Sequence, residues 1–111
     1  MTEWQALLLS IAIEAPIVAV VAGRYRLAPP LHAAGAIALA TAVTHPQLWM
    51  LALWAYPRLG YWPSILVLEA VVALVEAAVL AFVLRLQAGP ALLLSVMANG
   101  ISFLAGLVLI G

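Results

Sequence analysis

Five polar side chains interrupt otherwise apolar stretches of this sequence, and their chemistry suits the binding of protons or cations. They are Glu14, His45, Glu69, Glu76 and Asn99. Carboxylates combined with an imidazole and an amide are ligands for protons or for a hard or borderline divalent cation. The sequence has no cysteine and no HExxH, GxSxG, Walker or Rossmann pattern. We therefore expect a proton- or cation-binding site, with a divalent cation as the candidate cofactor, rather than the active site of an enzyme.

The composition places these residues in a membrane protein. Of the 111 residues, 68% are hydrophobic and only 7% are charged, which is too little charge to solvate the surface of a soluble domain. The apolar content also excludes a disordered chain. The basic residues are four scattered arginines, and without a basic patch we expect no nucleic-acid partner.

Four apolar stretches are long enough to cross a bilayer, because about 20 residues span its hydrocarbon core. They cover residues 4–22, 33–56, 62–84 and 91–111, and glycine, proline and arginine residues separate them. We expect an all-α fold, an integral membrane bundle of four transmembrane helices with short loops. Residues 1–111 would then form a single transmembrane domain.

The arginines predict how the bundle is oriented. Arg24, Arg26 and Arg85 lie in the first and third connections, and Arg58 lies in the second. Because cytoplasmic loops are enriched in basic residues, we expect both termini outside, in a bacterial inner membrane. Most of the large aromatic residues fall toward the same outer side, where they form either an interfacial anchor belt or a binding vestibule; they are Trp4, Trp49, Trp54, Tyr56, Tyr61 and Trp62.

The five polar residues come from all four predicted helices and fall near the middle of the bilayer. At a rise of about 1.5 Å per residue, they occupy a band roughly 10 Å deep. Glu14, Glu76 and Asn99 form an inner layer, and His45 and Glu69 form an outer layer. An ionised group at this depth costs about 3 kcal/mol on insertion scales. The acids must therefore face the bundle interior and be protonated, paired or bound to a metal.

Smaller polar side chains extend a polar seam along each helix. Glu69 and Glu76 are seven residues apart and share one helical face. Four hydroxyl residues lie at similar helical spacings, and we interpret them as auxiliary hydrogen-bonding partners: Ser10, Thr41, Ser95 and Ser102. Four such seams facing one another predict a polar core inside an apolar bundle.

Two prolines lie beside the site residues. Pro16 follows Glu14 by two positions, and Pro46 follows His45 directly. A proline inside a helix frees the carbonyl four residues earlier. Such carbonyls are tolerated at membrane depth where they face protein, water or an ion. We expect these freed oxygens close to the two ionisable side chains.

In outline the chain resembles the small multidrug resistance transporters. The likeness rests on a similar length, four helices with short loops, a membrane acid in the first helix (Glu14), and Tyr61 and Trp62 near the third helix. The chain differs in having three membrane acids where that family relies on one, and in its Thr44-His45-Pro46 segment. The resemblance is one of size and layout.

Three functions remain open. In the first, the protein is an ion- or proton-coupled transporter whose three acids carry protons or bind a cation, with His45 and Asn99 as auxiliary ligands. In the second, it is a structural or assembly subunit of a larger membrane complex, and the acids only clasp helices together. In the third, it is an intramembrane enzyme using general acid/base chemistry on a lipid-soluble substrate. Because four short helices enclose little space, we expect a homodimer or a place in a larger complex.

Overall fold

A computed structural model describes residues 2–109, and within them the chain forms four helices and no strand. The helices are α1 (Glu3–Arg24), α2 (Pro30–Leu59), α3 (Tyr61–Leu84) and α4 (Ala88–Leu109). Each is long and apolar enough to cross a membrane. The all-helical fold expected from the sequence is confirmed, and most helix ends lie within about three residues of the expected spans.

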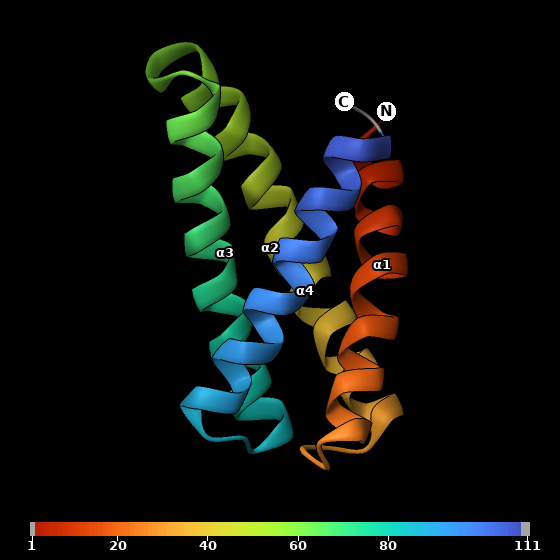
Figure 1. Ribbon diagram of the computed structural model, residues 1–111. Coiled ribbons are helices and arrows are strands. Elements are labelled where there is room, and N and C mark those ends of the chain that lie inside the picture. The colour runs from red at the N-terminus through yellow and green to blue at the C-terminus, as the bar shows by residue number, and fades with distance from the viewer. Residues whose placement is uncertain (1, 110–111) are drawn as a thin grey trace.

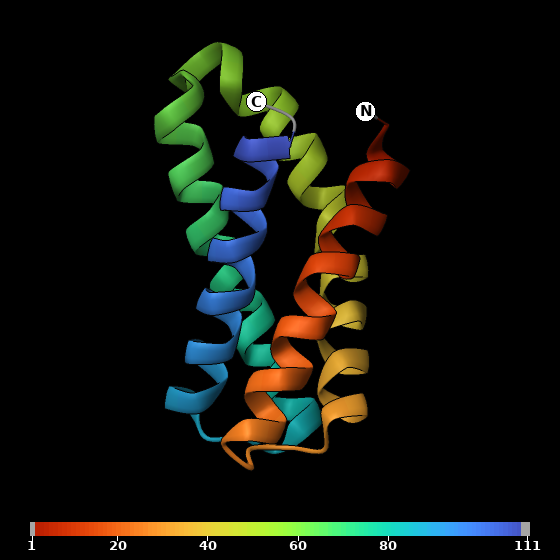
Figure 2. The ribbon, with the colours of Figure 1, turned by 45° about the vertical axis from the view of Figure 1, so that its right-hand side comes forward.

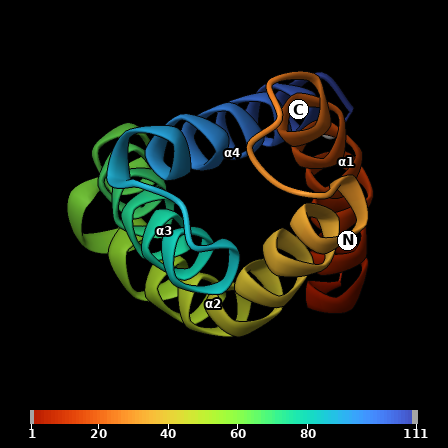
Figure 3. The same cartoon turned by 90° about the horizontal axis from the view of Figure 1, so that it is seen from below.

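The helices form a ring in which each packs against its neighbours along the chain and α4 returns against α1 (Figure 1). In the view along the bundle axis, α1 and α3 lie diagonally opposite each other (Figure 3). Both ends of the chain and the α2–α3 turn lie at one end of the bundle, which we call the terminal end (Figure 1). The α1–α2 and α3–α4 connections lie at the other, which we call the loop end.

The turn between α2 and α3 consists of a single residue. Gly60 has a φ of +84°, a conformation that side chains with a Cβ rarely adopt. α2 continues through Pro57 to Leu59, beyond the expected end at residue 56. Arg58 explains part of this extension, because its Nη1 donates a 2.7 Å hydrogen bond to the Trp54 carbonyl and so satisfies one acceptor in the last turn.

The loop end is closely packed around small side chains. A Cβ on Gly23 would lie 2.9 Å from Pro30 Cγ, so α1 and α2 meet there with no spare room. Small side chains let helices approach one another closely in membranes. The buried apolar core occupies this half of the bundle: Val18, Ala22, Ala33, Ala36, Ile37, Leu80, Ala91, Leu94 and Ala98.

Toward the terminal end the α2–α3 pair leans away from α1 (Figure 1; Figure 2). The first half of α2 buries Ala33, Ala36, Ile37, Ala40 and Thr41 against its neighbours, whereas the second half buries only His45 and Ala55. The second half of α2 is therefore packed less closely than the first. Exposed tryptophans lie near this end, at positions 4, 54 and 62, as is typical of a membrane–water interface. The bundle is therefore closed at the loop end and wider at the terminal end.

Candidate functional site

A cavity of about 380 Å³ lies inside the bundle, between its middle and the terminal end. Its lining extends from Glu14 and Glu76 at mid-height to Ala6, Tyr61 and Leu107 near the terminal end. The apolar core fills the other half of the bundle. The polar lining residues come from all the described helices: Ser10, Glu14, Thr41, Thr44, His45, Tyr61, Glu69, Glu76, Asn99 and Ser102.

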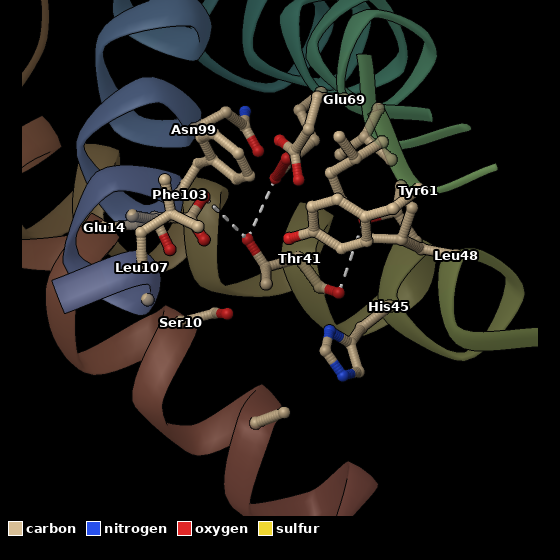
Figure 4. Close-up of a pocket in the computed structure, with 17 residues that line it drawn as sticks. Ser10, Glu14, Thr41, His45, Leu48, Tyr61, Glu69, Asn99, Phe103 and Leu107 are labelled. Carbon is tan, nitrogen blue, oxygen red and sulfur yellow. Dashed lines mark hydrogen bonds between the residues drawn. The ribbon is translucent and has the colours of Figure 1, made fainter. Parts of the chain in front are cut away.

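At the base of this cavity, one hydroxyl group joins two carboxyl groups. Thr41 Oγ1 lies 2.9 Å from Glu76 Oε2 and 3.3 Å from Glu14 Oε1. The exposed fractions of these side chains are 5% for Thr41, 1% for Glu76 and 3% for Glu14. We call this set of three residues the carboxyl bridge. It connects α1 to α3, which lie across the bundle from each other, through α2 (Figure 4).

The helical pattern explains why the three side chains meet. Glu14 lies in the buried stripe of α1 with Leu7 and Val18, and Glu76 lies in that of α3 with Val72 and Leu80. Such spacings of three, four or seven residues keep side chains on one helical face. Counted along its own helix, each member of the carboxyl bridge lies about 12 to 17 Å from the loop end. The side chains therefore meet at one height.

In the described part of the chain, no arginine lies near enough to neutralise the bridge. The arginines of the chain lie at or beyond helix ends, and Arg24, the nearest along α1, is about 15 Å from Glu14 by helical rise. A buried carboxylate without a counter-charge is strongly disfavoured in a low-dielectric surrounding. The bridge therefore favours protonated carboxyl groups or a bound cation.

Asn99 lines the cavity, but its amide donors are used within its own helix. Its Nδ2 lies 2.9 Å from the Ser95 carbonyl and 3.3 Å from Ser95 Oγ. Its amide oxygen is turned toward the cavity (Figure 4). The structure thus brings Asn99 to the inner layer, as the helical rise predicts, as a neighbour of the carboxyl bridge rather than as one of its members.

His45 and Glu69 line the same cavity closer to the terminal end. The His45 side chain is 8% exposed, and its ring lies 6.0 Å from that of Trp49, measured between centroids. Its Nε2 is buried, and the described residues offer it no hydrogen-bond partner. His45 also lies within electrostatic range of Glu3 in the first turn of α1. A buried polar atom without a partner is rare, and it marks His45 as a residue to test by substitution.

Glu69 occupies a different position, at the seam between α3 and α4. It is half-buried and lines both the cavity and a shallow apolar groove on the outside of that seam. Asn99 and Phe103 also line both spaces. Glu69 therefore lies where only a thin layer of side chains separates the cavity from the outer surface.

The two prolines do not act as expected. Pro16 and Pro46, and the residues four positions before them, lie on exposed faces of α1 and α2. A freed helical carbonyl points along the helix toward residue i+4, so these oxygens lie on the outer surface rather than in the cavity. Ala12 and Ala42 lie within a turn of Glu14 and His45 along their helices, but they are on exposed faces, so their carbonyl oxygens add no ligand to the cavity.

The auxiliary hydroxyl residues divide into three kinds. Ser10 and Ser102 are half-buried and line the cavity. Ser95 donates a hydrogen bond to the α3 main chain, and Thr41 is the centre of the carboxyl bridge. Sequence reasoning found the seam that holds Thr41 but not this role.

Other residues of the site have weaker sequence signals. Tyr61 and Phe103 line the cavity toward the terminal end, although nothing in their spacing marks them. Thr44 also lines it, but its hydroxyl donates to the Ala40 carbonyl at 2.9 Å, as threonines inside helices often do. Ser64 is 1% exposed and its hydroxyl has no partner among the described residues.

The donor set does not fit a tightly bound divalent cation. Among residues 2–109, no group of three or more His, Asp or Glu side chains is arranged to hold a metal ion. The carboxyl bridge offers two carboxyl groups and one hydroxyl, whereas Mg²⁺ and Ca²⁺ take about six to eight oxygen ligands. The arrangement suits protons and exchangeable monovalent cations better.

Comparisons with protein-family models, with curated proteins and with solved structures found no match for this chain. The likeness to the small multidrug resistance transporters therefore carries no family assignment. Function has to be inferred from the cavity and its residues.

Proposed function

We propose that the protein is a small ion- or proton-coupled membrane transporter, in which the carboxyl bridge is the proton site. The observation that carries this proposal is the burial of Glu14 and Glu76 at the base of a cavity, without a basic partner. A purely structural link between helices needs no carboxyl group, because Asn, Ser and Thr provide it at lower cost. Ionisable residues buried at membrane depth characteristically serve ion or proton pathways.

The shape of the cavity supports a transport cycle. A carboxylate binds a proton or a cation but not both at the same oxygen, so competition at the bridge exchanges one for the other. The described conformation gives access from the terminal end and is packed at the loop end. Transport then requires a second conformation in which the loop end opens. The small side chains of the apolar core favour such a rearrangement, because they interlock little.

The distribution of arginine and tryptophan supports an orientation for this cycle. Arg24, Arg26 and Arg85 lie at the loop end, which the positive-inside rule assigns to the cytoplasm. In a bacterial inner membrane, both termini and the cavity mouth would then face outward. The exposed tryptophans near the terminal end fit the outer interface.

The proposal is tested with purified protein in liposomes that enclose a pH-sensitive dye. A pH gradient, acidic inside, is imposed, and Na⁺, K⁺ or methylammonium is added outside as the probe. The wild type is expected to release protons faster with at least one probe, and Glu76→Gln is expected to lose this response while keeping its helical content. Ser64→Ala serves as the control, because Ser64 does not line the cavity. Equal proton release by the wild type and Glu76→Gln with every probe would contradict the proposal.

A structural or assembly subunit is the second candidate, and one observation favours it. The two hydrogen bonds of Thr41 tie α1, α2 and α3 together, and such a tie would also stabilise a bundle that only has to assemble with a partner. This candidate is supported if Glu14→Gln and Glu76→Gln cause no loss of function in cells and the protein consistently co-purifies with the same partner protein. A stable particle that contains no partner counts against it.

A further inference from the structure

The shared hydroxyl of Thr41 sets a limit on the number of protons in the carboxyl bridge. A threonine hydroxyl donates one hydrogen bond and otherwise accepts. Thr41 Oγ1 nevertheless has a carboxyl oxygen on each side, at 2.9 Å and 3.3 Å. If both carboxyl groups were ionised, one of these contacts would bring two oxygen atoms together with no hydrogen between them. The geometry therefore favours a state in which at least one carboxyl group is protonated and donates to Thr41.

The surroundings of the bridge disfavour complete ionisation for a second reason. Glu69 lies on α3 in the same cavity, and α4 contributes the neutral Asn99. His45 on α2, with Glu3 within its electrostatic range, is a further titratable group toward the terminal end. Two adjacent negative charges would have no cation of the chain beside them. With a single negative charge, one carboxyl group holds a proton and the other, stabilised by the Thr41 hydroxyl, can receive it.

We propose that Thr41 is a proton-relay residue, through which Glu14 and Glu76 share one proton. In one direction the O–H bond of Glu14 breaks and its proton passes to Thr41 Oγ1. At the same time the original Thr41 proton passes to Glu76, whose carboxylate becomes a carboxylic acid. The hydroxyl is restored, the number of protons is unchanged, and the negative charge moves from α3 to α1. This inference rests on the proposed function, and it names the Thr41 hydroxyl as the group that passes the proton between the two acids of the proton site.

His45 adds a second kind of proton-binding side chain to the same cavity. Its Nε2 is buried without a partner in the same cavity, between the bridge and the terminal end (Figure 4). An imidazole nitrogen accepts or donates a proton according to its protonation state. A water molecule or a transported cation that enters the cavity from the terminal end can therefore meet His45 before the carboxyl bridge.

Thr44 provides a matched control for Thr41. Both threonines lie on α2, line the cavity and are one helical turn apart. The Thr44 hydroxyl donates to the Ala40 carbonyl of its own helix, whereas that of Thr41 lies between the two acids. Valine has the shape of threonine without the hydroxyl group, so Thr41→Val and Thr44→Val remove the same atom from two environments.

The first experiment is infrared spectroscopy of the carbonyl stretch of protonated carboxyl groups, on protein in lipid bilayers at neutral pH. We expect one such band that depends on both Glu14 and Glu76, so that Glu14→Gln and Glu76→Gln each remove or shift it. Thr41→Val should shift the same band, and Thr44→Val should leave it in place. Two independent bands, each sensitive to only one of the Glu→Gln substitutions, would overturn the relay. These two spectra decide the question even if Thr41→Val does not fold.

The second experiment measures proton release from liposomes with the probe cation that works for the wild type. Thr41→Val should lower the rate at least about tenfold, as expected when a proton-transfer group is lost. Thr41→Ser and Thr44→Val should stay within about threefold of the wild type, since a single intact hydroxyl suffices. Normal transport by Thr41→Val would overturn the relay and leave the proposed function standing. A shared band without any coupled transport would overturn the proposed function and leave the shared proton standing.

Discussion

Ser95 of α4 donates a 2.6 Å hydrogen bond to the main-chain carbonyl of Ala73 on α3. Ser95 is fully buried, and Asn99, one turn further along α4, donates both to its carbonyl and to its hydroxyl oxygen. This contact anchors α4, a helix that carries no acid, beside the carboxyl bridge. A hydroxyl-to-backbone hydrogen bond thus fixes one wall of the cavity. This contact uses none of the three glutamate side chains.

The first prediction concerns this contact. Ser95→Ala leaves the half-buried Ala73 carbonyl without its side-chain donor and removes an acceptor of Asn99. We expect the free energy of unfolding to fall by about 1 kcal/mol, the usual value for a polar contact between membrane helices. Thermal unfolding in detergent measures it. Ser102→Ala is the control, because Ser102 lines the cavity and makes no hydrogen bond among the described residues, and an equal loss in both variants would contradict the assignment.

The second prediction separates the function of His45 from its contribution to stability. His45→Phe keeps an aromatic ring beside Trp49 and removes an Nε2 that is buried without a partner. Replacing an unsatisfied buried polar atom by an apolar one is expected to raise stability by about 1 to 2 kcal/mol. The rate of coupled proton release should nevertheless fall.

Ser64 supplies the comparison for this experiment. Its hydroxyl is also buried without a partner among the described residues, but it does not line the cavity. Ser64→Ala should therefore leave stability unchanged or increase it and should not affect transport. A loss of stability in His45→Phe would mean that Nε2 has a structural partner, and the transport role of His45 would lose its support.

The third prediction concerns access to the cavity. The chain has no natural cysteine, so single cysteines report on their own positions. Ser102 and Gly106 line the cavity. The variants Ser102→Cys and Gly106→Cys should therefore react with a membrane-impermeant thiol reagent added from the side of the terminal end. Leu94→Cys lies in the apolar core at 1% exposure and should be protected from both sides. Reaction of Leu94→Cys from the loop end, at a rate equal to that of Ser102→Cys, would contradict a cavity closed at that end.

The fourth prediction concerns the packing of the loop end. Gly23→Ala would place a Cβ 2.9 Å from Pro30 Cγ, and the proline ring cannot turn away. We expect a destabilisation of about 1 to 3 kcal/mol from this overpacking, measured by thermal unfolding. At Gly35, a Cβ meets nothing within 4 Å, so Gly35→Ala should be neutral or stabilising by up to about 1 kcal/mol. If both substitutions had the same effect, the close approach of α1 and α2 would be in doubt.

Much of the fold could be predicted because membrane helices must satisfy simple rules. Length and apolar content identify the four spans, and glycine, proline and arginine mark their ends. The α2–α3 turn is the main exception, because α2 accommodates Pro57 and ends at Leu59, just before Gly60. A proline in the last turn removes one hydrogen bond but does not force the helix to stop there.

The sequence predicts the position of the site residues along the bundle axis, but not the contacts that they make. Helical rise places Glu14 and Glu76 in one layer, and both residues meet there. Rise alone does not give the rotation of each helix or the rotamer of each side chain. These decide that Thr41 bridges the acids and that Asn99 bonds within α4. The alanine-rich first half of α2 was a usable sign that the cavity would open at the other end.

The central claim is that Glu14 and Glu76 act as one proton site, and a double-substitution cycle tests it most directly. Glu14→Asp and Glu76→Asp keep the acids but shorten each side chain by one methylene group and weaken its contact with Thr41. The measurement is the rate of cation-driven proton release from liposomes for both single variants and the double variant. If the residues form one site, the double variant should be about as slow as the slower single variant. The claim would be contradicted if the fold-losses in rate of the two single variants multiplied in the double variant. It would also be contradicted if both single variants were as fast as the wild type.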